Sequence, residues 1–350
     1  MILDKLPTDS LKRYPSIDML RGIAIFTMLM ANSAAESLVT PHSYLIRIYG
    51  SFAAPIFIFL AGFMVAIGSR KHNTPYFFRR GIEILVVAAL IDVFIWGIIP
   101  FTTFDVLYLT GIGIPVAALL MKTKFPVQLV CVIGMILLGP ILQMVFNYNA
   151  EVHEFSISEF SSGQLPSGVL WWFKSLLMDG WFPVFPWMGI LVAGAMVAEH
   201  GAILIDKAKL FFAIGAVLFL AGITWLYFHP AIAEREGYSE LFYPPGAAYL
   251  IAATGALLMS VVLLRYLKPV YGLQVVQWLG SCSLFIYIFH SALICFVLDE
   301  YFLAWPLANF LGLYVAFAAG NIAFAYLFFQ LKKKAWWRRL PQLVRFVFGG

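Results

Sequence analysis

The chain is poor in charged residues. Only 12% of its 350 residues are Asp, Glu, Lys or Arg, and 62% are hydrophobic, whereas an average soluble domain has about 25% charged and about 45–50% apolar residues. So little charge cannot coat a soluble globule of this size, and the 17% of aromatic residues exclude a disordered chain. The composition therefore predicts an all-α, polytopic membrane protein that forms a single transmembrane domain over residues 1–350.

The chain also lacks the common motifs of soluble enzymes and metal proteins. Its three cysteines lie in apolar stretches without a CxxC or His-rich cluster, so neither a disulfide framework nor a metal site is predicted. No Ser-His-Asp pattern, phosphate loop, HExxH or dinucleotide fingerprint is present. Function has to be sought in polar residues that interrupt the hydrophobic segments.

Long hydrophobic segments are abundant. A membrane helix needs about 20 mostly apolar residues, and ten segments qualify: 17–39, 49–69, 80–100, 104–121, 126–146, 182–198, 210–228, 245–264, 275–298 and 304–331. Because ten is an even number, both termini are expected on one side of the membrane.

The basic residues predict which side that is. With the N-terminus in the cytoplasm, cytoplasmic segments hold 19 of the 23 Lys and Arg residues, and outer segments hold only Arg47, Lys174 and Arg235. This distribution follows the positive-inside rule. It predicts a cytoplasmic segment 1–16 and a basic cytoplasmic tail 332–350. The net charge of +5 then reflects orientation, so no nucleic-acid partner is expected.

Ionisable residues inside membrane helices are costly and are candidates for function. Asp18 and Arg21 lie three residues apart in the first helix, where a local salt bridge is an equally good interpretation. Glu83 is expected to pair with Arg79 or Arg80. Nine residues further on, Asp92 is half a turn out of phase with Glu83, so its partner must lie on another helix.

Two histidines lie toward the predicted outer side. His290 is in the outer half of the ninth segment. The sequence is consistent both with a buried structural role and with a functional role for this histidine. His42 follows Pro41 in the short outer segment between the first two helices. An imidazole with a pKa near ~6.5 can accept a proton from a hydroxyl or amine, although most isolated loop histidines have no such role. Glu36 is close enough in the chain to orient the ring.

The segments 13–32, 52–63, 179–189 and 280–290 resemble the motifs of a known family, the transmembrane acyltransferases related to heparan-α-glucosaminide N-acetyltransferase. The family pattern R-x-x-S-x-D-x-x-R-G-x-A with a later Asn is matched by residues 13–24 and Asn32. The patterns F-P-x-F-x-F-x-x-G and P-x-F-P-W-x-G resemble residues 52–63 and 179–189. Residues 280–290 are similar to L-G-x-x-S-L-x-I-Y-x-x-H of the wider type-three acyltransferases. Each segment is short, but together they run in order from the first to the ninth predicted helix.

The resemblance implies acyl transfer across a membrane. Members take an acyl group, commonly acetyl, from cytoplasmic coenzyme A and deliver it to a hydroxyl or amine on the far side, with a histidine of the first outer loop in the place of His42. Whether that histidine is acylated or acts only as a base stays open. The resemblance implies a catalytic role for His42. We expect His290, Asp18 and Arg21 to take part in catalysis as well, with Asp92 and Asp105 lining or bracing the route and without a metal. The dense basic cluster Arg70, Lys71, Arg79 and Arg80 is expected, together with Asn32, at the acyl-coenzyme A donor, although the positive-inside rule alone also predicts such a cluster.

The chain departs from the family at two positions that bear on the acceptor. The type-three acyltransferases carry a histidine eleven residues after the first-helix Arg, where this chain has Asn32. The heparan-modifying branch usually has an acidic residue where this chain has Ser51. The expected acceptor is therefore an extracytoplasmic glycan or another cell-surface hydroxyl or amine rather than heparan. Membrane lipid is a further expected partner, and homo-oligomerisation stays open.

Two other classes fit part of the pattern. A secondary transporter or a flippase of a polar or lipid-linked substrate would also have about ten helices with a few buried carboxylates, but the chain shows no internal repeat. A non-catalytic membrane scaffold would not need the ionisable residues inside its helices. Binding of a thioester distinguishes the acyltransferase from both.

Overall fold

The computed structural model describes residues 14–149, 152, 154–163, 169–229, 240–243, 245–268 and 272–348. Helices dominate these residues, and β-structure within them amounts to two isolated bridges, Leu38 with Trp305 and Ile98 with Ser156. The described chain divides into two compact units. The α1 unit comprises residues 14–56, 240–241 and 259–348, and the α9 unit comprises residues 57–229 and 242–258.

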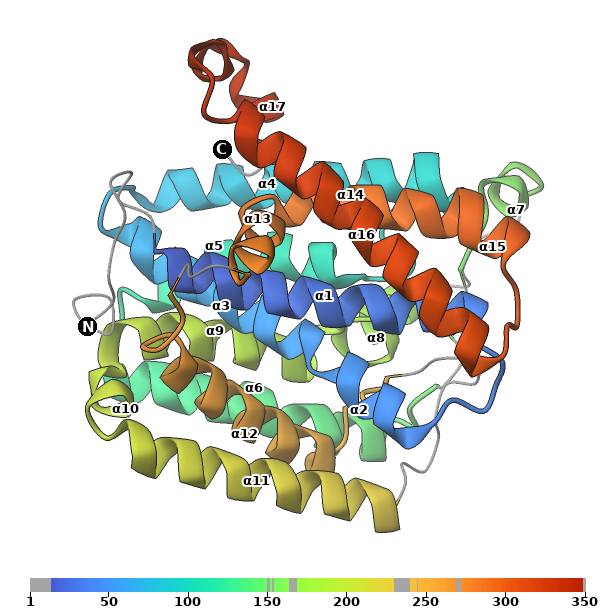
Figure 1. The fold of residues 1–350 in the computed structure, drawn as a ribbon. Helices are drawn as coiled ribbons and strands as arrows, with labels where there is room; N and C mark the ends of the chain where they lie inside the picture. The colour runs from blue at the N-terminus through green and yellow to red at the C-terminus, as the bar shows by residue number, and fades with distance from the viewer. Residues whose placement is uncertain are drawn as a thin grey trace. The chain divides into compact units, whose positions relative to one another are not determined.

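The α1 unit is built around its first helix. α1 (Pro15–Ser37) lies against α13 (Gln274–Ser281), α16 (Leu307–Leu331) and α2 (Tyr44–Ser51) (Figure 1). Two glycines permit its contact with α13: a Cβ atom on Gly22 would lie 1.6 Å from the Val276 carbonyl oxygen, and one on Gly280 would lie 1.7 Å from the Asp18 carbonyl oxygen. The remaining elements are α14 (Ser283–Leu293), the π-helical turn Ile294–Leu298, α15 (Asp299–Tyr301), the short 3₁₀ helix Ala335–Arg339 and α17 (Gln342–Val347).

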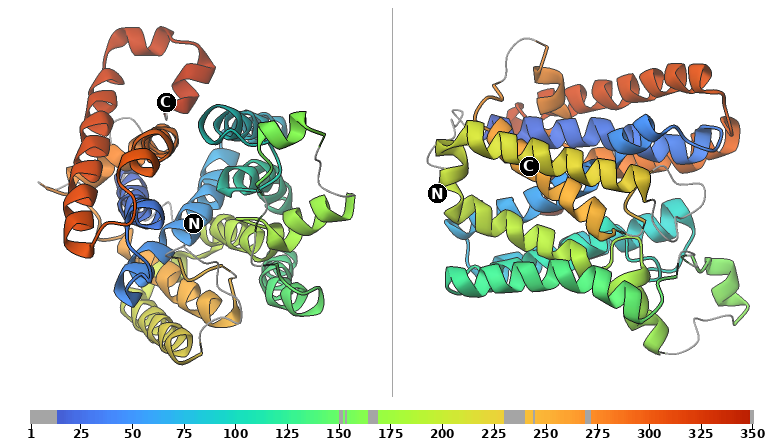
Figure 2. Two further views of the ribbon diagram at one scale, coloured as in Figure 1. Left: turned by 90° about the vertical axis from the view of Figure 1, so that its right-hand side faces the viewer. Right: turned by 90° about the horizontal axis from the view of Figure 1, so that it is seen from below.

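The α9 unit packs several helices on α9 (Val184–His200). α5 (Val106–Leu120) and α6 (Phe125–Val145) contact α9, and α4 (Thr74–Ile91) contacts α5 (Figure 2). α3 (Ala53–Ser69) approaches α9 at two glycines, since a Cβ on Gly62 would lie 1.7 Å from the Leu191 carbonyl oxygen and one on Gly194 would lie 1.9 Å from that of Phe59. The other elements are the π-helical turns Asp92–Trp96 and Ser175–Asp179, α7 (Ile157–Ser161), α8 (Val169–Lys174), α10 (Ala202–Asp206), α11 (Ala208–Phe228) and α12 (Ala247–Leu263), whose last residues belong to the α1 unit.

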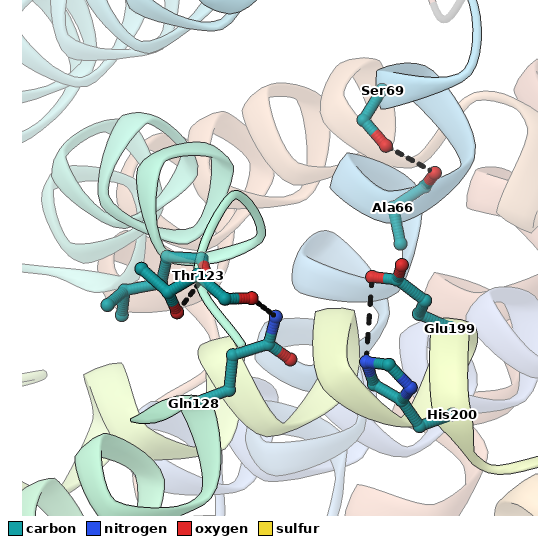
Figure 3. Close-up of polar contacts among 7 residues, drawn as sticks. Ala66, Ser69, Thr123, Gln128, Glu199 and His200 are labelled. Carbon is teal, nitrogen blue, oxygen red and sulfur yellow. Dashed lines mark hydrogen bonds and ion pairs between the residues drawn. The ribbon is translucent and has the colours of Figure 1, made fainter. Parts of the chain in front are cut away.

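One end of the α9 unit is tied by short polar contacts. The Ser69 hydroxyl donates to the Ala66 carbonyl at the end of α3, and the buried Gln128 amide donates to the Thr123 carbonyl in the turn between α5 and α6 (Figure 3). His200 and Glu199 lie 3.8 Å apart at the end of α9. These contacts give partners to groups where helices end and intrahelical partners run out.

The helices confirm a membrane protein, while the count of ten spans stays a prediction. Every predicted segment falls on a helix. Among the described residues, however, six helical stretches are both long and apolar enough to cross a membrane, or seven if the bent pair Leu170–Asp179 and Val184–His200 counts as one span. α5 and α12 are shorter apolar helices. In α6 and in α11, only 17% of the apolar stretch that could cross the membrane is buried inside the protein. The rest forms broad apolar faces for contact with lipid. The sidedness predicted from Lys and Arg likewise stays a prediction.

Two predicted segments differ in extent from the helices that contain them. The third helix begins at Thr74 rather than residue 80, because Pro75 occupies its first turn, where a missing N–H and a fixed φ suit a helix start. The segment 275–298 was predicted as one helix, but the helix is interrupted at Cys282. At this break the Lys332 ammonium donates to the Ser281 carbonyl over 2.6 Å, so a side chain from α16's end supplies a partner to that backbone group.

Candidate functional site

The segment that carries His42 is clamped by main-chain hydrogen bonds. α1 ends at Ser37, and the following residue Leu38 has extended backbone angles. The Trp305 N–H donates to the Ser37 carbonyl over 2.7 Å, and the Val39 N–H donates to the Trp305 carbonyl over 3.0 Å. The start of the loop is therefore held by the chain just before α16.

This clamp orients the His42 imidazole through a single backbone atom. His42 Nε2 lies 3.2 Å from the Leu38 carbonyl oxygen. Because a carbonyl oxygen only accepts hydrogen bonds, Nε2 must carry the proton, and in the neutral ring Nδ1 then has the free lone pair. The geometry makes Nδ1 the basic and nucleophilic atom of His42.

The surroundings of His42 favour its neutral form. Partial burial lowers the pKa of the imidazole below its usual value of 6.5, and the nearby positive charge of Arg47 acts in the same direction, while the hydrogen bond to Leu38 opposes both. A base must be unprotonated in order to accept a proton. The surroundings of His42 thus favour the form that acid–base catalysis requires.

Asn32 and His290 form a second pair, 258 residues apart in the chain. Asn32 Nδ2 lies 3.0 Å from His290 Nε2, and His290 Nδ1 lies 3.0 Å from the Ile286 carbonyl oxygen. The carbonyl requires a proton on Nδ1, so Nε2 accepts from the Asn32 amide in the neutral ring. His290 is 0% exposed, and both of its ring nitrogens are engaged.

The structure brings Asn32 and His290 together but does not join His42 to either of them. Among the described residues no hydrogen bond links His42 to that pair. Asp18 and Arg21 lie in the first two turns of α1, so at 1.5 Å per residue Arg21 is about 17 Å along the helix axis from Asn32. A catalytic role for Asp18 and Arg21 stays a prediction, and it would have to be at the far end of α1 from His42.

Four of the predicted donor residues, Arg70, Lys71, Arg79 and Arg80, belong to the α9 unit and lie at the turn from α3 to α4, here called the basic turn. Asn32, the fifth, belongs to the α1 unit. Glu83 pairs with Arg80 over 3.3 Å and with Arg79 over 3.7 Å, which confirms its predicted pairing. Arg70 and Lys71 are exposed after the end of α3. In the next turn the His72 ring stacks on Tyr76 with centroids 3.9 Å apart, and the Arg79 guanidinium lies 5.7 Å from the centre of the Tyr76 ring.

Asp92 has its partner on another helix, as predicted. The Tyr108 hydroxyl on α5 donates to the Asp92 carboxylate over 2.5 Å, and both residues are buried. Asp105 accepts from the Val106 N–H at the start of α5, so it caps a helix. No group of three or more His, Cys, Asp and Glu side chains suited to a metal ion occurs within the described part of the chain.

Sequence reasoning missed Trp305 and Tyr108. Trp305 acts through its backbone, for which a side-chain pattern carries no signal. Tyr108 could have been sought, since the buried carboxylate of Asp92 requires a donor, but many hydroxyl groups in the apolar segments were equally suitable.

One comparison with known proteins identifies a family. The family model described as heparan-alpha-glucosaminide N-acetyltransferase, catalytic, matches residues 13–216, which is more than half of the chain. The match includes Asn32, His42 and the basic turn, and it ends within α11, so His290 lies beyond it. None of the curated proteins compared with the chain matches it.

Proposed function

The chain belongs to the family of the heparan-α-glucosaminide N-acetyltransferase catalytic domain, and from this premise we propose what it transfers and where. It is an integral membrane protein of the acetyltransferase type. In our proposal it moves an acyl group, acetyl in the first place, from cytoplasmic acyl-coenzyme A to a hydroxyl or amine. The acceptor belongs to an extracytoplasmic glycan or another cell-surface molecule, and the membrane is the bacterial inner membrane.

The geometry of His42 carries the proposal. Its Nε2–H is held by the Leu38 carbonyl, so Nδ1 accepts the proton of the acceptor hydroxyl or amine as that oxygen or nitrogen bonds to the acyl carbon. The carbon–sulfur bond breaks, and the thiolate leaves and takes up the proton as the thiol, which restores neutral His42. The same lone pair is able to attack the acyl carbon first, and trapping of an acylated His42 in a single turnover distinguishes the two routes.

Asn32 and His290 support the donor in this proposal. One Nδ2 hydrogen of Asn32 is used on His290, which leaves the second N–H and the amide oxygen of Asn32 for the thioester. An amide N–H directed at the acyl oxygen stabilises the negative charge that develops there. His290, fixed by the Ile286 carbonyl, holds the Asn32 amide in place.

The basic turn is suited to the phosphates of the donor. Arg70, Lys71, Arg79 and Arg80 offer positive charge next to the Tyr76 ring, and guanidinium groups bind phosphate through paired N–H donors. Glu83 pairs with Arg79 and Arg80, so the exposed Lys71 is expected to contribute strongly to phosphate binding. Asp18 and Arg21, at the start of α1, keep their predicted role in catalysis in this proposal.

The direct test uses purified protein in membranes of defined composition. Transfer of labelled acetyl from acetyl-coenzyme A to candidate glycan or amine acceptors is measured for the wild type, His42→Ala and a matched control, His200→Ala. Loss of a general base lowers the rate by about 10²–10⁴-fold, so His42→Ala is expected to lose transfer while it keeps donor binding and Tm. His200→Ala, which removes a histidine at the end of α9, is expected to keep full activity.

Two results would contradict the proposal at different points. Failure of the wild type to bind any thioester in a panel of acyl-coenzyme A donors would exclude acyl transfer. Full activity of His42→Ala would leave acyl transfer in place but remove His42 as the base and make His290 the next candidate.

A further inference from the structure

The C-terminal tail, residues 332–348, folds back onto the end of α16. The Phe348 ring lies 4.5 Å from Phe328 and 4.7 Å from Phe285, and Trp337 packs at 5.8 Å on Phe348. Trp337 and Phe346 are only 5% and 3% exposed. The tail is thus anchored to α14 and α16 by aromatic contacts, directly after a helix that is long and apolar enough to cross a membrane.

The tail has an unbalanced charge. It carries six cations, and the sequence contains no Asp or Glu after Glu300. The Lys332 ammonium donates a hydrogen bond to the Ser281 carbonyl, and the Lys333 ammonium lies 4.5 Å from the centre of the Phe329 ring. Lys334 and Arg339 are exposed. Within the described residues no carboxylate pairs with Lys333, Lys334, Arg339 or Arg345.

The tail also contains two buried donors that lack an acceptor. Trp337 Nε1 and Arg345 Nε are buried and have no hydrogen-bond partner among the described residues. Arg345 is three residues before Phe348, so the two share a face of the chain at α17, and Phe348 contacts the Trp337 ring. An unsatisfied buried donor is energetically unfavourable, and such groups generally indicate a missing partner.

We propose that the tail binds the phosphate of an anionic membrane-lipid headgroup. A phosphate supplies the acceptor oxygens that Trp337 and Arg345 lack and the negative charge that the surrounding cations lack. The adjacent membrane helix places the tail at headgroup level, where the exposed Trp336 (48% exposed) matches the enrichment of tryptophan at membrane interfaces. Clusters of basic residues next to a membrane helix bind anionic lipids. Orientation by the positive-inside rule requires the cations but does not account for the two buried donors.

The test compares lipid compositions in nanodiscs. The Tm of the wild type is measured in phosphatidylcholine alone and with phosphatidylglycerol added, and retained phosphatidylglycerol is counted by native mass spectrometry. The variants are Arg339→Gln/Arg345→Gln and Trp337→Phe in the tail, with Lys122→Gln/Lys124→Gln between α5 and α6 as a control of equal charge. Lys333→Gln/Lys334→Gln, which changes two exposed side chains, replaces the arginine variant if that one does not fold.

Phosphatidylglycerol is expected to raise the Tm of the wild type and of the Lys122/Lys124 control alike. Each cation near an anionic surface contributes about 1 kcal/mol, so loss of two weakens binding about 30-fold, and the double tail variants should lose the Tm gain and the retained lipid. Trp337→Phe should reduce both while its Tm in phosphatidylcholine is unchanged. A tail variant that keeps the full gain, or a control that loses it equally, would overturn the proposal. A Tm gain from coenzyme A or inorganic phosphate in phosphatidylcholine, without one from phosphatidylglycerol, would assign the tail to a soluble phosphate and overturn it as well.

Discussion

His42 and His290 show how hydrogen-bond partners determine what a histidine is able to do. His290 is completely buried and uses both ring nitrogens, one on Asn32 and one on the Ile286 carbonyl. His42 uses only Nε2, on the Leu38 carbonyl. The free Nδ1 lone pair makes His42 the better candidate for a base, although His290 lies in the more strongly patterned segment.

The first prediction concerns the pH dependence of transfer. Burial and the Arg47 charge lower the pKa of His42 below 6.5, so the neutral base persists to a lower pH than in an ordinary histidine. Activity is expected to be constant near pH 7 and to fall only on the acidic side of pH 6.5. Arg47→Gln removes one of the lowering causes, so the acidic limb of the kcat/KM profile should move to higher pH.

Arg47→Lys is the matched control. It keeps the positive charge, so the acidic limb of its kcat/KM profile should lie at the same pH as in the wild type. An unchanged limb in Arg47→Gln would show that this charge does not act on the catalytic base. Activity at pH 8 should be similar in all three proteins, since His42 is neutral there in each.

At the scale of helices, the glycines of the family-like segments act as points of close approach. Gly22 and Gly280 allow α1 to meet α13, and Gly62 and Gly194 allow α3 to meet α9. The motifs therefore include residues that allow helices to pack closely, in addition to the residues proposed to act in catalysis. In the P-x-F-P-W-x-G segment, Trp187 is 0% exposed and packs between Phe182 and Phe242, which is a structural role.

The second prediction tests one such contact. A Cβ on Gly62 would lie 1.7 Å from the Leu191 carbonyl oxygen, so Gly62→Ala forces α3 and α9 apart and is expected to cost about 1–3 kcal/mol or more. Gly134→Ala on α6 is the control, because a Cβ there meets nothing within 4 Å. Thermal unfolding in detergent should show a lower Tm for Gly62→Ala and an equal or higher Tm for Gly134→Ala. Equal Tm values for both variants would show that the close contact of α3 and α9 is not needed for stability.

At the scale of the whole molecule, charge placement predicts the topology. The turn between α5 and α6 carries Lys122 and Lys124 and is expected in the cytoplasm, and the acidic, Trp-containing loop over residues 147–180 is expected outside. The helices are consistent with a polytopic protein, but their length and composition do not decide which end faces which side.

The third prediction follows from this topology. In a background without the three native cysteines, Ser162→Cys should react with a membrane-impermeant maleimide in intact cells. Thr123→Cys should react only after the membrane is permeabilised. Both positions are exposed, so a failure to react reflects sidedness rather than burial. The reverse pattern would overturn the orientation predicted from Lys and Arg.

The amino-acid sequence was sufficient to predict the membrane class, the approximate position of the long helices and the family. These follow from hydrophobicity, charge and short motifs, which are local properties of the chain. The helices differ from the predicted segments at two places. One helix begins earlier, with Pro75 in its first turn, and another is interrupted at Cys282.

The hydrogen-bond partners of the polar residues became known only from the folded chain. Asn32 meets His290 across 258 residues, Trp305 clamps the start of the His42 loop, and Tyr108 satisfies Asp92. Hydrogen bonds depend on which atoms fold to within about 3 Å of each other, and no periodicity along a chain encodes that. For the same reason the sequence identified two histidines as candidates, whereas the folded chain decided that one of them keeps a free nitrogen.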